Sequence, residues 1–309
     1  MLHFRLGTRS SPLALWQANF VADILKNAGA TIELVQYETV GDKILNRSLA
    51  EIGNKGLFTE ELEQDLRLKN TDLAVHSAKD VQSVLDDDLE LLAFCERELA
   101  NDVVMSFDKN VRLSLLNENQ IVGTSSTRRK AFLKYYFPIL QTAEVRGNLQ
   151  TRIKKLENGQ YKAILLAYAG VRRAGLESLI VEKLDLQQFT PAVGQGSVAI
   201  ETHKELAKEK KDFLKKHLNH HQTSICLETE RAFLATLEGG CSIPIFGYAH
   251  INSAQKIVFE GGIISLNGKE MIKIKEISTE NPIIFGKKLA EKLLNQGGDK
   301  ILAEIKKVR

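Results

Sequence analysis

HFRLGTRSSPLALWQANFVADILKNAG, residues 3–29, is the stretch that decides the fold class. Residues 3–7 have the pattern of a strand, and a helix is expected to open at Ser11 and Pro12 because proline is favoured in a first helical turn. This helix places Leu15, Ala18, Ala22 and Leu25 on one face and ends before Gly29. A strand that leads into an amphipathic helix is the repeating unit of α/β proteins with largely parallel sheets.

The same alternation continues through residues 1–97, which we predict to be a first unit. Its further strands are expected at 31–39, 73–77 and 90–94, with a helix at 58–68. A second unit, residues 98–196, has predicted strands at 103–106, 121–123 and 163–166 and helices that begin after the hydroxyl residues 124–126 and at Asn148. The hinge-like sequence PAVGQG at 191–196 precedes a strand at 198–201, so residues 197–218 are predicted to cross back to the first unit.

Residues 219–309 follow a different order of elements and are predicted to form an α+β unit. A helix at about 223–237 precedes strands at 245–251, 257–265 and 270–277 and a final helical region. Asn267 and Gly268, between the last two strands, are a strong hairpin signal. We therefore expect a three-stranded antiparallel sheet with helices on one face.

Composition argues against several classes of function. A formal net charge of +3 over 309 residues is too small for a nucleic-acid footprint unless the charge is focused locally, and the aromatic residues lie mainly within apolar runs. Arg5 comes before any long apolar run and no stretch is long enough to span a bilayer, so neither a signal peptide nor a membrane anchor is expected. Cys95, Cys226, Cys241 and the histidines lack disulfide or metal-site spacing, which predicts a cytoplasmic protein without a metal.

Arginines recur where predicted strands end and helices begin. In a doubly wound sheet such positions meet at the carboxyl ends of the strands, where ligands bind. Because a guanidinium grips a carboxylate through two parallel hydrogen bonds, this set predicts a polyanionic ligand. Any one of these side chains could instead be a solvated surface residue, and that alternative is weaker for the whole set. The set is Arg9, Arg128, Arg129, Arg146, Arg152, Arg172 and Arg173.

Two polar segments of the first unit are further candidates. In VHSAKD, residues 75–80, a buried strand runs out into Lys79 and Asp80, and a carboxylate there can bind cationic N–H groups or move protons. We interpret His76 as a structural histidine, and Asp80 taken alone would also be structural. Lys55 lies in GNKG at 53–56, which could form an anion-binding loop or a simple turn.

Cys241 lies in GGCSIP, between a predicted helix and a predicted strand. Flanking glycine and a nearby proline make its thiol accessible and held, and arginines close by would stabilise a thiolate that acts as a nucleophile or attachment point. Cys95 and Cys226 lie in apolar elements, so we interpret them as small buried hydrophobic residues.

Taken together, these segments resemble the hydroxymethylbilane synthase (porphobilinogen deaminase) family over nearly the whole chain. The matching segments occur in the family's order: RLGTRSSPLALWQA, GNKGLFTEELE, DLAVHSAKDV, VGTSSTRRKAFL, EVRGNLQTRI, LLAYAGVRRAGL, PAVGQGSVAIE and ERAFLATLEGGCSIPI. The resemblance implies two domains like type II periplasmic binding proteins, with mainly parallel sheets, and a third α+β domain that carries the cofactor cysteine. It also implies a cytoplasmic monomer.

The resemblance further implies a dipyrromethane cofactor joined by a thioether to Cys241, on which four porphobilinogen molecules are condensed with loss of ammonia. Asp80 matches the family residue that stabilises the cationic azafulvene-type species formed from the substrate. Residues implied to bind the cofactor are Ser77, Lys79, Asp80, Thr124, Ser125, Ser126, Arg128, Arg129, Arg146 and Gly147. Those implied to bind the substrate are Arg9, Ser11, Lys55, Arg146, Arg152, Arg173 and Gln195.

The chain departs from the family pattern at two places. Gln82 stands where proline is usual after HSAKDV, and Phe246 stands where glycine is common after GGCSIPI. Both positions flank the chemical residues, so they bear on loop conformation. The competing hypothesis is a non-catalytic small-anion binding protein of the same fold, which would need the arginine cleft but neither Cys241 nor Asp80.

Overall fold

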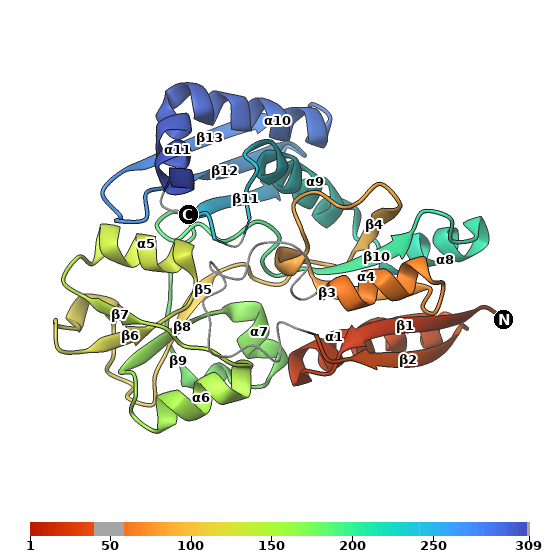
Figure 1. Cartoon of the computed structure of the whole chain (residues 1–309), viewed down its shortest axis with the longest axis horizontal. Helices are drawn as coiled ribbons and strands as arrows, with labels where there is room; N and C mark the ends of the chain where they lie inside the picture. Colours follow the sequence, from red (N-terminus) through yellow and green to blue (C-terminus); the bar gives the residue numbers. More distant parts are fainter. Residues whose placement is uncertain (40–58, 241, 308–309) are drawn as a thin grey trace.

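The computed structural model describes residues 1–39, 59–240 and 242–307. Figure 1 shows two α/β units side by side, with a third unit across one side of the pair. Each unit is built around its own sheet, of five, five and three strands. Except where they fall outside the described residues, the expected strands and helices are all present, with ends that differ by a few residues.

The first sheet is a mainly parallel one into which a later segment is inserted. Its strand order is β2 (Thr31–Tyr37), β1 (His3–Arg9), β3 (Leu73–Ser77), β10 (Val198–His203) and β4 (Leu89–Phe94). β10 runs antiparallel to both of its neighbours, which confirms that the chain crosses back after the second unit. One face packs on α1 (Pro12–Asn27) and α8 (Lys208–Leu218), and the other on α4 (Glu60–Arg67).

The second sheet repeats this plan. Its order is β7 (Gln141–Ala143), β6 (Ile121–Gly123), β8 (Ala163–Ala167), β5 (Asp102–Met105) and β9 (Ile180–Lys183), and β5 is the strand that opposes its neighbours. The helices of this unit are α5 (Thr127–Tyr136), α6 (Leu149–Glu157) and α7 (Tyr168–Arg173). Short 3₁₀ turns lie at Ala78–Asp80 (η1) in the first unit and at Leu113–Leu115 and Glu177–Leu179 in the second.

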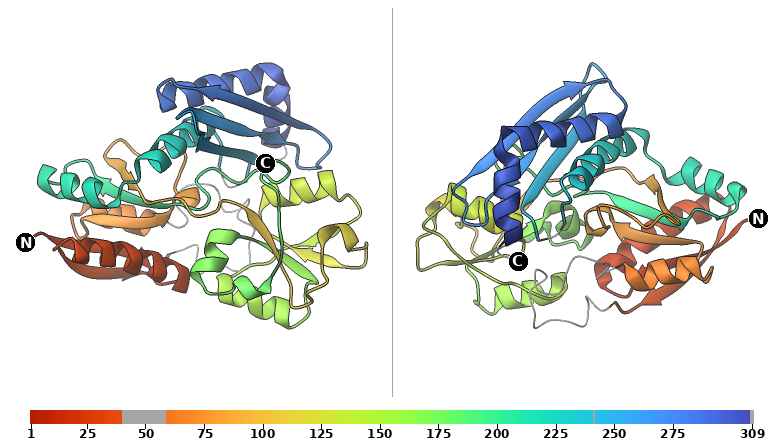
Figure 2. Two further views of the ribbon diagram at one scale, coloured as in Figure 1. Left: turned by 180° about the vertical axis from the view of Figure 1, so that it is seen from behind. Right: turned by 45° about the horizontal axis from the view of Figure 1, so that its top comes forward.

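The third sheet is the predicted antiparallel one, with strands β11 (Ile245–Ile251), β12 (Ile257–Ile264) and β13 (Met271–Ser278). Helices α9 (His221–Thr236), α10 (Pro282–Leu293) and α11 (Asp299–Lys307) gather on one face, as Figure 2 shows. The chain kinks between the last two at Gly297, which has φ of +100°. On the other face, Phe246 enters the core of the second unit, where its ring centroid lies 4.9 Å from that of Phe132.

Local capping chemistry explains where the helices of the second unit begin. The Asn148 side chain accepts a hydrogen bond from the backbone N–H of Thr151 at 2.9 Å and so caps α6. The Ser126 side chain caps α5 in the same way by accepting from the backbone N–H of Arg129. Gly147, with φ of +107°, precedes the Asn148 cap, and a Cβ there would lie 2.6 Å from Cγ2 of Thr151. Only glycine fits this turn, which directs the backbone of 146–148 toward the first unit.

Candidate active site

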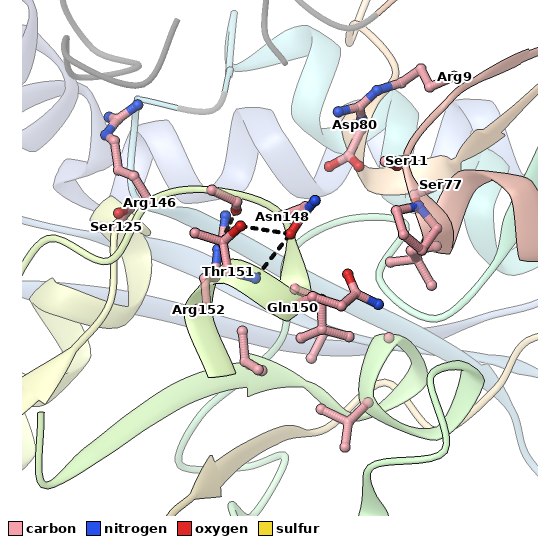
Figure 3. A pocket seen from close by; sticks show the side chains of 18 of the residues that line it. Arg9, Ser11, Ser77, Asp80, Ser125, Arg146, Asn148, Gln150, Thr151 and Arg152 are labelled. Atoms are coloured by element: carbon pink, nitrogen blue, oxygen red, sulfur yellow. Dashed lines mark hydrogen bonds between the residues drawn. The ribbon is translucent and has the colours of Figure 1, made fainter. Parts of the chain in front are cut away.

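A polar cleft of about 510 Å³ lies between the first two units, at the carboxyl ends of β1, β3, β6 and β8. This is the edge at which α/β sheets bind ligands, and the volume suits an organic ligand of ordinary size. Figure 3 shows Arg9, Ser77 and Asp80 of the first unit on one side and Arg146, Asn148 and Arg152 of the second unit on the other. The cleft thus brings together predicted residues that are far apart in the sequence: Arg9, Ser11, Ser77, Lys79, Asp80, Ser125, Arg129, Arg146, Gly147 and Arg152.

Positive charge dominates this lining. Among the described residues of the lining, the charged members are Asp80 and five cations, namely Arg9, Lys79, Arg129, Arg146 and Arg152. Burial lowers the pKa of Arg152 to about 10, with the like charge of Arg129 acting in the same direction, so the guanidinium stays protonated at neutral pH. A partly buried cluster of like charges is unfavourable unless anions join it, so the cleft is suited to a ligand with several carboxylates.

Two of the cleft arginines are oriented by contacts with residues 144–148, the loop between β7 and α6. Arg152 donates from Nε to the carbonyl of Gly147 at 2.8 Å, and Nε of Arg146 lies 3.7 Å from a carboxylate oxygen of Glu144. Ser125 is fixed to the same loop, because its hydroxyl donates to the carbonyl of Val145 at 2.9 Å. The loop between β7 and α6 therefore presents several donors toward the ligand space in a set arrangement.

Lys79 and Asp80 lie in η1, directly after β3. Burial lowers the pKa of Lys79, and the neighbouring carboxylate of Asp80 opposes that shift. Lys79 makes no ion pair of hydrogen-bonding length with any residue in the described ranges. The two side chains provide one cation and one carboxylate next to each other, so this part of the cleft can bind an anionic group and a cationic or N–H group.

Asp102, a buried carboxylate that the sequence analysis did not identify, binds two of the predicted arginines. Asp102, at the start of β5, is fully buried and lies 2.8 Å from both Arg128 and Arg129, and Gln195 donates to it at 2.9 Å. Burial acts to raise the pKa of Asp102, but the two guanidinium groups outweigh burial and hold that pKa well below its usual range. Arg129 also lines the cleft, so Asp102 fixes one of the ligand-facing cations.

Other predicted site residues lie outside the cleft lining. Arg128 is buried and donates to the carbonyl of Thr190 at 2.9 Å, while Gln195 is held by Asp102 and the carbonyl of Ala100. Arg173 donates to the carbonyl of Gly196 at 2.7 Å and lies 5.4 Å above the Trp16 ring, across the boundary between the two units. Thr124 and Ser126 flank the lining residue Ser125 without lining the cleft themselves. Lys55 and Cys241 fall outside the described residues.

Two interpretations of single residues are confirmed. Cys95 and Cys226 are buried, and burial raises the pKa of each thiol to about 12, so neither is a nucleophile at neutral pH. His76 is buried with its Nε2 atom 2.9 Å from a carboxylate oxygen of Glu201, and its structural role stays a prediction.

Metal sites and membrane-spanning helices are both absent from residues 1–39, 59–240 and 242–307. Histidine, cysteine and carboxylate side chains do not gather into any group there that could hold a metal ion. Among the helices of those ranges, none combines the length and apolar character needed to cross a bilayer.

Comparison with known proteins gives a consistent picture over the full length. The family model described as porphobilinogen deaminase, dipyromethane cofactor binding domain, matches residues 4–211, and the model for the porphobilinogen deaminase C-terminal domain matches residues 224–295. A porphobilinogen deaminase of Cytophaga hutchinsonii is 50% identical over 305 residues, covering 98% of this chain and 97% of the relative. One of Desulfosudis oleivorans is 44% identical over 307 residues, covering 99% of each chain.

Among solved structures, two have backbones that can be superposed on 72% of this chain. Lipoprotein Tp32 from Treponema pallidum has a TM-score of 0.46 and 9% identity, covering 72% of this chain and 94% of its own. A putative methionine-binding lipoprotein from Bacillus subtilis has a TM-score of 0.45 and 13% identity, covering 72% and 93%.

Proposed function

The chain belongs to the porphobilinogen deaminase family, and we propose that the cleft between its first two units is where it carries out the family's reaction. The protein is a transferase, a hydroxymethylbilane synthase. It condenses four porphobilinogen molecules head to tail with loss of ammonia, on a bound dipyrromethane primer, and releases linear hydroxymethylbilane for tetrapyrrole biosynthesis. The matches to porphobilinogen deaminases over nearly the whole chain do not favour the alternative of a non-catalytic anion binder.

The donor set of the cleft fits a dipyrromethane. Each pyrrole ring carries an acetate and a propionate, so a primer of two rings is a polyanion that matches the five cations and one carboxylate among the described lining residues. When bound, this group supplies the pyrrole α-carbon to which each porphobilinogen is joined. We propose that the sulfur of Cys241 holds it by a thioether, as the resemblance implies. Ser77, Lys79, Asp80, Ser125, Arg129, Arg146 and Gly147 would surround it, and Arg9, Ser11 and Arg152 would bind the incoming substrate.

We propose supporting roles for the predicted residues that do not line the cleft. Arg128 and Gln195 share the carboxylate of Asp102 with Arg129, so they fix the direction of that ligand-facing guanidinium. Thr124 and Ser126 flank the lining residue Ser125 at the start of α5. Arg173 joins the hinge carbonyl of Gly196 to α1. Lys55 remains a candidate ligand for substrate carboxylates.

Asp80 is the catalytic residue that we propose, and its role is to stabilise positive charge on the reacting substrate. Loss of ammonia from porphobilinogen leaves a cationic species whose positive charge spreads onto its pyrrole nitrogen. A fixed carboxylate facing pyrrole N–H groups stabilises that charge as it develops, and the effect is strong where water is partly excluded. The neighbouring cations would bind the ligand carboxylates, which would leave Asp80, the one acidic side chain among the described lining residues, available to the pyrrole N–H groups.

The observation that carries this proposal is that Asp80 is the one carboxylate beside five cations in the part of the lining that the structure describes. An Asp80→Asn variant tests it. We expect kcat to fall by about 10²-fold or more, with KM changed far less, because charge stabilisation acts in the transition state. Asp87→Asn, on an exposed aspartate outside the cleft, is the matched control. Intact mass must show equal primer content in both variants. An Asp80→Asn enzyme with kcat within about twofold of wild type would refute the role.

The remaining features of the proposal concern organisation and surroundings. We propose that the domains are residues 1–97 with about 197–218, residues 98–196 and residues 219–309, because each range contains one sheet. We also propose a monomer that works in the reducing cytoplasm, where the buried, unpaired thiols of Cys95 and Cys226 are stable.

A further inference from the structure

A group of buried charges lies on the face of the first sheet that packs against α4 and α9. Glu201 of β10 is fully buried, and its carboxylate lies 2.9 Å from Nε2 of His76 without the alignment of a hydrogen bond. Glu63 of α4 is 4% exposed. Arg231 of α9 completes the group and offsets part of the negative charge of Glu201. None of these side chains lines the cleft.

Gln82 joins this group to the segment that carries Asp80. Its side-chain amide donates to the Glu63 carboxylate at 3.3 Å, and its backbone carbonyl accepts from Arg231 at 2.7 Å. The same guanidinium nitrogen lies 3.4 Å from the carbonyl of Ser83. The chain two residues after Asp80 is therefore held from two sides, by a helix of the first unit and by a helix of the third.

The segment has another anchor at its beginning. The backbone N–H of Ala78 donates to the carbonyl of Ser197 at 3.0 Å, and η1 then covers only Ala78–Asp80. So short a turn has little stability of its own, because its hydrogen-bond geometry is poor. The direction in which Asp80 projects thus depends on the contacts at both ends of the segment.

We propose that Gln82 is a positioning residue for Asp80. By binding the Glu63 carboxylate it restricts the chain after η1 and holds the Asp80 carboxylate in the cleft. This inference rests on the function proposed for Asp80 and concerns a position where the chain departs from the family pattern. Arg231 supports the same segment through the backbone, so its contact is available to any residue at position 82.

The backbone suggests a substitution that separates restriction from side-chain chemistry. Val81 has φ of −76° and ψ of 139°, which is the extended conformation required of a residue before proline. Within the described ranges, the backbone N–H of Gln82 makes no hydrogen bond to another backbone group that a proline would remove. Gln82→Pro would therefore restrict the segment through its ring alone, whereas Gln82→Met keeps the length of the side chain and loses the amide.

The experiment compares Gln82→Met, Gln82→Pro and a control, Gln64→Met, whose glutamine is exposed on α4. We expect Gln82→Met to lower kcat about 5- to 10-fold with KM within about twofold, because a small displacement of a catalytic group costs rate rather than affinity. Hydrogen exchange in a peptide covering residues 78–88 should become faster in this variant. Gln82→Pro should return both kcat and exchange to near the wild-type values, and intact mass should show equal primer content throughout.

The activity and hydrogen exchange of these variants either support or overturn the positioning role of Gln82. A Gln82→Met enzyme with wild-type kcat, or with unchanged exchange at 78–88, would overturn the proposal. A Gln82→Pro enzyme as impaired as Gln82→Met would also overturn it, because restriction would then not be what the amide provides. Asp80→Asn is measured beside them. If that variant keeps its activity while exchange responds as expected, the role proposed for Asp80 is wrong and the anchoring by Gln82 stands.

Discussion

Replacing Asp102 by asparagine removes the charge on which two buried arginines depend. Asp102 is fully buried, Arg128 and Arg129 are 5% and 6% exposed, and both guanidinium groups lie 2.8 Å from its carboxylate. Breaking a buried ion pair by removing one partner costs about 3–5 kcal/mol of folding free energy. The amide oxygen of asparagine can still accept a hydrogen bond, so we expect Asp102→Asn to lower the free energy of unfolding by about 3 kcal/mol. At a urea slope of about 3 kcal/mol/M, this corresponds to a fall of about 1 M in the unfolding midpoint.

Urea unfolding followed by circular dichroism at pH 7 measures the effect, with Asp212→Asn as a control on an exposed ion pair. The folded-state pKa of Asp102 is depressed, so its contribution to stability is present above its unfolded-state pKa, near 4, and is lost as pH falls below that value. The gap between wild type and Asp102→Asn should therefore be constant from pH 6 to 8 and narrow below about pH 4. A midpoint equal to that of the control at pH 7, or a gap that widens in acid, would refute the reasoning.

Three further predictions follow from the packing and charge of particular residues. Phe246→Ala should lower the free energy of unfolding by about 3–5 kcal/mol in urea melts, because the ring is fully buried in the core of the second unit; a loss below about 1 kcal/mol would contradict this packing. Arg152→Lys should raise KM for porphobilinogen about tenfold, because an ammonium cannot form the two parallel bonds of a guanidinium; Arg172→Lys, on an exposed arginine paired with Glu98, should leave KM unchanged in the same kinetic assay. Cys95 and Cys226 should resist iodoacetamide at pH 8 until the protein is unfolded, because burial raises the pKa of each thiol to about 12; rapid labelling of either in the folded protein, detected by peptide mass, would count against their burial.

Local patterns in the sequence were sufficient to predict most of the fold. The helix caps at Ser126 and Asn148, the strand 121–123 and the hairpin at Asn267 and Gly268 depend on neighbours within a few residues. Four of the seven predicted arginines, Arg9, Arg129, Arg146 and Arg152, also meet at one cleft, because the carboxyl ends of parallel strands share an edge.

Features that depend on contacts between distant residues could not be predicted in the same way. Arg128 and Arg129 are adjacent and chemically alike, yet Arg129 lines the cleft while Arg128 does not, and both bind Asp102, which is 26 and 27 residues away. Nothing in the sequence around Asp102 distinguishes it from a surface aspartate. Phe246 stands where the family commonly has glycine, and the residues around it do not indicate where its ring packs. The ring is buried by the packing of the third unit against the second, a contact between distant parts of the chain.

Intact mass of the purified protein tests the central claim most directly, measured beside Cys241→Ser and a Cys226→Ser control. We predict that wild type and Cys226→Ser carry an adduct with the mass of two porphobilinogen units less two ammonias. Both should give a pyrrole colour with an acidic aldehyde reagent and form hydroxymethylbilane. Cys241→Ser should lack the adduct. A wild-type chain that is unmodified, and that stays unmodified after incubation with porphobilinogen, would contradict it.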